Sequence, residues 1–143
     1  MEHTKLLFEP VRLENGLCVY FEDRSTAVAG GRYQAVLSIS IPMEVAQVCR
    51  RESNDSSGAC DRYVRALGHT VVYRQDKVRN FIDGARLHET LREMKEEFLT
   101  TRFPYISKPG FALRFIESCF SKEEEKKSWQ EAYMKALDSP EHD

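Results

Sequence analysis

The chain has 143 residues, of which 41% are hydrophobic and 31% charged, a composition typical of globular rather than disordered proteins. Its 21 basic and 23 acidic side chains leave a formal charge of −2, so no global field attracts nucleic acid or an anionic membrane. The N-terminus lacks an apolar signal segment, and no apolar run approaches the length of about 18 residues that a transmembrane helix needs. We therefore expect a cytoplasmic protein that binds neither nucleic acid nor membrane.

The first expected element is a β-hairpin around Asn15-Gly16. These two residue types adopt positive φ more readily than others, and the pair lies between strand-like runs at 5–13 and 17–22. The pattern predicts a two-residue type I′ turn in which both residues have positive φ. Pro10 indicates that the first strand is an edge strand or is interrupted there.

The clearest strand covers residues 32–43, where apolar side chains recur at every second position. They are Tyr33, Ala35, Leu37, Ile39 and Ile41. This period of two predicts a strand with one buried face. After Arg32 the next charged residue is Glu44. A long uncharged edge invites pairing with another chain, so the strand is either central in its sheet or covered by a partner. The second alternative favours a homodimer.

The segment between residues 43 and 80 predicts more strands. Residues 43–50 are expected to extend the pairing, and 51–58 form a polar loop rich in turn-forming residues. Residues 60–78 predict a second hairpin or meander that is broken near Gly68. The result is an antiparallel sheet of four to five strands over residues 5–80.

After about residue 84 the hydrophobic period changes to that of a helix. The apolar positions that share one face are Leu87, Leu91, Met94 and Phe98. Asp83 is a suitable N-cap for this helix, and Phe103-Pro104 is expected to end it.

Two further helical segments follow. Residues 111–120 carry a second apolar face, and Ser121 with Glu124 matches a capping box that predicts the start of a final helix. That helix is expected to dock through its apolar face, which includes Trp129, Tyr133 and Leu137. Strands followed by helices predict an α+β fold, with two to three helices over about 84–137 packed on the sheet. We expect residues 1–143 to form a single domain.

No pattern in the sequence indicates catalysis or a metal. The four histidines share no close ligand spacing, and the four cysteines contain no C-x-x-C pair. They are His3, His69, His88 and His142, and Cys18, Cys49, Cys60 and Cys119. Phosphate-binding glycine motifs and G-x-S-x-G are also absent from the sequence. We expect reduced thiols, no metal, no cofactor and no enzymatic activity. An enzyme whose site is assembled from distant residues is a third hypothesis after the two below.

A basic region at 50–79 is the candidate ligand site. Seven basic and four acidic side chains leave it with a local charge of +3, which favours a phosphate-bearing ligand. The candidate residues are Arg50, Arg51, Arg62, Arg65 and Arg74. PilZ domains bind a cyclic dinucleotide on an antiparallel barrel with a C-terminal helix, through R-x-x-x-R followed by [DN]-x-S-x-x-G. Here Arg50 and Arg51 are adjacent instead of four residues apart. Residues 54–58 are one residue shorter than the second motif and follow the arginines too closely. The resemblance is partial and implies a ligand-sensing or nucleotide-sensing alternative.

Aromatic residues on the helices support the leading hypothesis. Such residues anchor protein interfaces, and the candidates are Phe103, Tyr105, Phe111, Trp129 and Tyr133. The alternative is that all of them fill one core. We expect a non-enzymatic domain that acts through association with a protein partner or with itself, as a homodimer.

Five segments together resemble a group of small uncharacterised bacterial proteins. They are "LENGL" (13–17), "DRS" (23–25), "AG" (29–30), "RNFID" (79–83) and "FPYISKPGF" (103–111). The resemblance spans most of the chain and implies a bacterial origin and a hairpin followed by helices. None of its motifs is catalytic, so it implies no activity.

Overall fold

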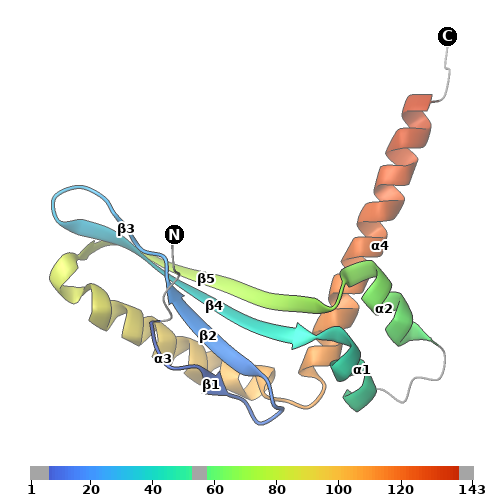
Figure 1. Cartoon of the computed structure of the whole chain (residues 1–143). Coiled ribbons are helices and arrows are strands. Elements are labelled where there is room, and N and C mark those ends of the chain that lie inside the picture. Colours follow the sequence, from blue (N-terminus) through green and yellow to red (C-terminus); the bar gives the residue numbers. More distant parts are fainter. Residues whose placement is uncertain (1–6, 53–57, 139–143) are drawn as a thin grey trace. The chain divides into compact units, whose positions relative to one another are not determined.

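Strands and helices are both present in the computed structural model, which describes residues 7–52 and 58–138. In this part of the chain five strands form one antiparallel sheet, and four α-helices accompany them (Figure 1). The predicted α+β class and the predicted number of strands are confirmed. The residues group into two compact units. The sheet unit comprises the residues up to Met43 and Val72–Phe111, and the helical unit comprises Glu44–Val71 and the residues from Ala112 onwards. That residues 1–143 fold as one domain stays a prediction.

The sheet is arranged around β4 (Arg32–Glu44). Strands β2 (Cys18–Asp23) and β3 (Thr26–Ala27) pair with β4 in one continuous antiparallel register. Strand β1 (Val11–Arg12) continues the sheet beyond β2. Strand β5 (Thr70–Asp83) also pairs with β4, and Figure 1 shows it on the side of β4 away from β2. Strand β4 is therefore the central strand.

The central position of β4 decides between the two explanations of its uncharged sequence. Ala35, Leu37, Ile39 and Ile41 are fully buried, which confirms the predicted strand with one buried face. Because β4 has neighbours on both sides, its lack of charge between Arg32 and Glu44 needs no covering partner. This strand therefore gives no support for a homodimer.

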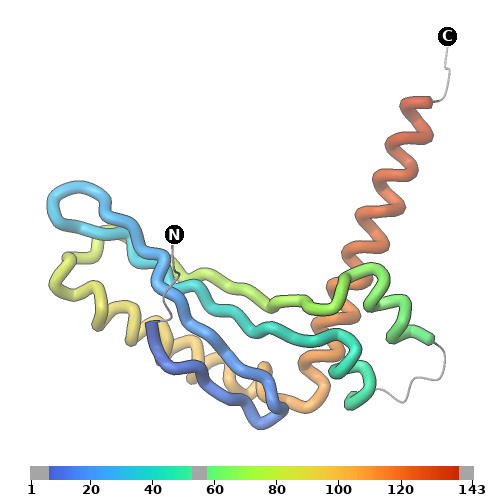
Figure 2. Tube along the Cα trace, viewed as in Figure 1, coloured from blue at the N-terminus to red at the C-terminus, as the bar shows by residue number. Residues whose placement is uncertain are grey.

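Helix α3 (Leu87–Ile106) covers one face of the sheet, as the tube in Figure 2 shows. Its predicted apolar face is confirmed, since Leu91, Met94 and Phe98 are buried. Asp83 caps the short 3-10 turn before the helix (Gly84–Arg86), where its carboxylate accepts the Ala85 N–H at 3.1 Å.

The prediction that α3 ends at Phe103-Pro104 was wrong, because the helix continues for about one more turn. Pro104 lies inside the last turn of the helix, which continues to Ile106. Ser107 closes this turn, because its N–H and its hydroxyl both donate to the Phe103 carbonyl, at 3.0 and 2.6 Å.

The turn at Asn15-Gly16 exists, but it is not of type I′. Gly16 has a φ of 91°, whereas Asn15 is not among the residues with positive φ. The Gly16 N–H donates to the Leu13 carbonyl at 3.0 Å, and the Leu13 N–H donates to the Leu17 carbonyl at 2.7 Å. These bonds define a three-residue loop in which a type I turn is followed by glycine in a left-handed conformation. Only the glycine in this loop needs positive φ.

The strands predicted between residues 43 and 67 were wrong, because this segment forms two helices of the helical unit. They are α1 (Val45–Glu52) and α2 (Ala59–Leu67). Val45, Val48 and Cys49 recur at helical spacing and are buried, but eight residues are too few for the period to decide between helix and strand. The predicted polar loop lies mostly at 53–57, outside the described residues.

The two helices predicted after residue 111 are one helix, α4 (Phe111–Asp138). Ser121 lies in its middle, so the predicted capping box does not start a helix there. The segment contains neither glycine nor proline, and its many Glu, Lys, Ala and Leu residues favour an uninterrupted helix. In the helical unit, Tyr63 of α2 packs on Phe120 of α4 with ring centroids 4.9 Å apart. No helix in the described part of the chain is both long and apolar enough to cross a membrane.

Candidate functional site

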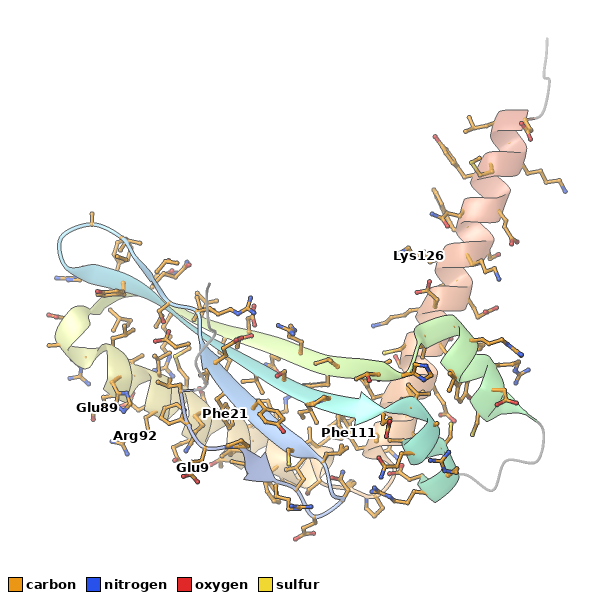
Figure 3. All side chains as sticks on the ribbon, viewed as in Figure 1. Glu9, Phe21, Glu89, Arg92, Phe111 and Lys126 are labelled. Atoms are coloured by element: carbon orange, nitrogen blue, oxygen red, sulfur yellow. The ribbon has the colours of Figure 1, made fainter. Side chains whose placement is uncertain are left out.

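The second half of α4 carries the largest exposed apolar side chains of the helical unit. Every residue from 121 to 138 is exposed, and Lys126, labelled in Figure 3, marks this segment, from which side chains project on all sides. Four of its residues form what we call the α4 stripe. They are Trp129, Tyr133, Met134 and Leu137, with exposed fractions of 71%, 54%, 60% and 63%. The predicted docking of this helix through Trp129, Tyr133 and Leu137 is therefore wrong for the described chain.

The α4 stripe is continuous along the helix. Trp129, Tyr133 and Leu137 are four residues apart, a spacing that places them one above the other on one face. The rings of Trp129 and Tyr133 are stacked, with centroids 6.1 Å apart and planes inclined by 13°. Contiguous apolar surface of this kind on a water-exposed helix marks an interaction site.

Among the described residues, only side chains of α4 line the open grooves beside the stripe. One groove runs next to Tyr133 and Met134, and another runs next to Trp129. A small-molecule site normally encloses its ligand between several elements. Open grooves along a single helix suit the side chains of another protein better.

The remaining predicted interface aromatics lie in the sheet unit. Phe111 is buried there, with its ring centroid 5.7 Å from that of Tyr73 and 5.3 Å from that of Tyr105. Phe111 therefore belongs to the core, whereas Tyr105 is 46% exposed and Phe103 is half-buried. Of the predicted set, Phe111 is therefore a core residue, whereas the exposed Trp129 and Tyr133 belong to the α4 stripe. Sequence reasoning missed Met134, which gains its importance only from the exposure of α4.

The predicted basic residues do not form one site. Arg62 and Arg65 of α2 line a hollow of about 300 Å³ in the helical unit together with Ala66, Phe120, Glu124 and Lys127. Arg50 and Arg51 lie in the last turn of α1, and neither lines this hollow. Arg74 is an exposed residue of β5 in the sheet unit. The added cation, Lys127, comes from a distant part of the chain, so the sequence did not reveal it.

The described histidines, cysteines and carboxylates offer no metal-binding group, and one thiol has a shifted pKa. No three or more His, Cys, Asp or Glu side chains of residues 7–52 and 58–138 are grouped as metal ligands. Burial raises the pKa of the Cys119 thiol, and the nearby Lys122 opposes this only in part. Cys119 is therefore a weak nucleophile at neutral pH. His3, His142 and most of the segment 54–58 lie outside the described residues.

Comparison of the chain with protein-family models, with curated proteins and with solved structures gives no match. The bacterial resemblance of the segments described above stays an expectation.

Proposed function

We propose that this protein is a non-enzymatic association domain, and that its α4 stripe packs against apolar side chains of another protein. The exposure of Trp129, Tyr133, Met134 and Leu137 supports this proposal more than any other observation. Each Å² of this apolar surface that a partner covers would stabilise the complex by roughly 25 cal/mol. Tryptophan and tyrosine are also the residues most enriched at the energetic centre of interfaces.

Trp129 provides a direct test, because it is the only tryptophan of the chain. In dilute purified protein its fluorescence should be red-shifted and fully accessible to acrylamide. When a partner covers the stripe, the emission should move to shorter wavelength and the quenching should fall. A blue-shifted, protected Trp129 in the dilute monomer would show that the chain covers its own stripe, and the proposal would fail.

Photo-cross-linking in the native cells tests which face of α4 is used. A photoreactive amino acid at Tyr133 should give a discrete adduct, whereas one at Lys135 should not. Lys135 lies two residues after Tyr133, which turns its side chain by about 200° and moves it about 3 Å along the helix, so it is a nearby control on the opposite face. Equal adducts from both positions, or none from Tyr133, would contradict the proposal.

A phosphate-bearing ligand at the α2–α4 hollow is the second candidate function. Among the described residues, Arg62, Arg65 and Lys127 line this hollow with one carboxylate, that of Glu124. Three cations around one small hollow favour an anion. Saturating cyclic dinucleotide or pyrophosphate should then raise the melting temperature by several degrees. The shift should vanish in the variant Arg62→Ala/Arg65→Ala and persist in Arg50→Ala, whose side chain lies outside the hollow. Absence of any shift would remove this candidate.

A further inference from the structure

Strand β5 is an outer strand of the sheet. Among the described residues it pairs with β4 alone, and Figure 1 shows no other strand beside it. At such an edge every second residue directs its N–H and C=O away from the sheet, which makes it a template for another strand. At 14 residues β5 is the longest strand of the described chain, so it offers a long template.

The side chains of β5 alternate strictly between two environments over residues 72–79. Lys77 and Arg79 are half-buried and form ion pairs with Glu97 of α3, at 3.4 and 3.3 Å. The opposite face carries only exposed side chains. They are Val72, Arg74, Asp76 and Val78, and the two valines are 40% and 50% exposed. This face therefore combines two uncovered apolar residues with one cation and one anion.

We propose that β5 pairs antiparallel with β5 of a second copy of this chain, with the two-fold axis at Gln75. In this register Arg74 of each copy lies opposite Asp76 of the other, and Val72 lies opposite Val78. On the other face Tyr73 lies opposite Lys77. Directly opposed residues in an antiparallel pair are close enough for opposite charges and apolar side chains to stabilise each other. The same sequence thus supplies both halves of each pair, as a two-fold interface requires.

The charges select this register over its neighbours. Moving the axis by one residue to Asp76 places Asp76 opposite itself, and moving it to Arg74 places Arg74 opposite itself. Like charges directly opposed destabilise a strand pair. If the two-fold axis instead lay between two residues, each side chain would lie opposite one that points to the other face of the sheet. Charged residues usually protect an edge strand from pairing. Here the charges of Arg74 and Asp76 disfavour pairing with strands that lack matching charges and favour pairing with a second copy.

This interface is separate from the α4 stripe and does not depend on it. If the proposed function also holds, a dimer presents two stripes, and a partner with two binding sites is held more tightly than by one. Only that consequence rests on the proposed function.

A charge exchange on the purified full chain tests the pairing. Arg74→Asp places two Asp–Asp pairs at the axis, and Asp76→Arg places two Arg–Arg pairs there. Each single variant should raise the dissociation constant of the dimer about tenfold or more. The double variant Arg74→Asp/Asp76→Arg restores opposite charges and should return to within about threefold of the wild type. Asp61→Arg, at an exposed α2 position, makes the same charge change as Asp76→Arg and should have no effect.

Sedimentation equilibrium across a hundredfold concentration range gives the masses. The wild type should pass from the 16.6 kDa chain mass to twice that value, and circular dichroism should show that every variant is folded. A wild type that stays monomeric throughout, or single variants that dimerise like it, would overturn the proposal. A dimer abolished by Trp129→Ala/Leu137→Ala but insensitive to the charge exchange would refute β5 pairing and support the α4 stripe. The two proposals therefore fail separately.

Discussion

Replacement of Phe21 by alanine is expected to lower the free energy of unfolding by about 3–5 kcal/mol. Phe21 is fully buried on β2. Its ring meets those of Phe8 and Phe98 edge to face, with centroids 6.3 Å away in both cases. The substitution removes these contacts and leaves a cavity between the sheet and α3, which the rigid β2–β4 pairing cannot close.

A loss of this size is a large part of the roughly 5–15 kcal/mol that stabilises a typical domain. Urea denaturation followed by circular dichroism measures it, and the midpoint should fall markedly. Tyr20→Ala is the matched control, because Tyr20 precedes Phe21 on the same strand but points to the opposite, half-buried face. The control should lose less than half as much. Equal losses would mean that the core does not lie on the face of β2 assigned to it.

Substitution of Asn15 by aspartate is expected to destabilise the sheet unit by about 3 kcal/mol. The Asn15 amide group donates to the carbonyl oxygens of Ile106 and Lys108, at 2.8 and 3.0 Å. Its Oδ1 accepts the N–H of Leu17 at 3.2 Å. Aspartate keeps the acceptor for Leu17 but directs a negative oxygen at two carbonyls that need a donor.

The control for this substitution is Asn15→Ala, which removes the same hydrogen bonds without adding a charge. Its loss should be smaller, at about 1–2 kcal/mol. The deficit of the aspartate variant should also shrink in acid, because a protonated carboxyl group can again donate a hydrogen bond. Thermal or urea unfolding at neutral and acidic pH measures both effects. An aspartate variant as stable as the wild type would show that the amide does not hold the end of α3.

Local patterns in the sequence determined much of the sheet unit. Alternation from Tyr33 to Ile41 identified the strand with a buried face, and helical spacing from Leu87 to Phe98 identified the face of α3 that packs on the sheet. Gly16 was recognised as a residue with positive φ. Each of these features is decided within a few neighbouring residues, because side-chain direction and steric freedom follow from the local backbone. The sequence also identified part of the candidate site, since Trp129 and Tyr133 were among the predicted interface residues.

Features that depend on contacts between residues distant in sequence were decided only by the tertiary structure. Whether α1 and α2 are helices or strands depended on packing, because their runs are short enough to satisfy either period. The amide contact of Asn15 with Ile106, at the end of α3, spans 91 residues of sequence and leaves no local trace. The order of the strands places β4 in the centre and β5 at the edge, which decides between the two alternatives that the uncharged sequence of β4 left open. An apolar helix face predicts only that the face will be covered, so the sequence could not show that Trp129 on α4 is exposed.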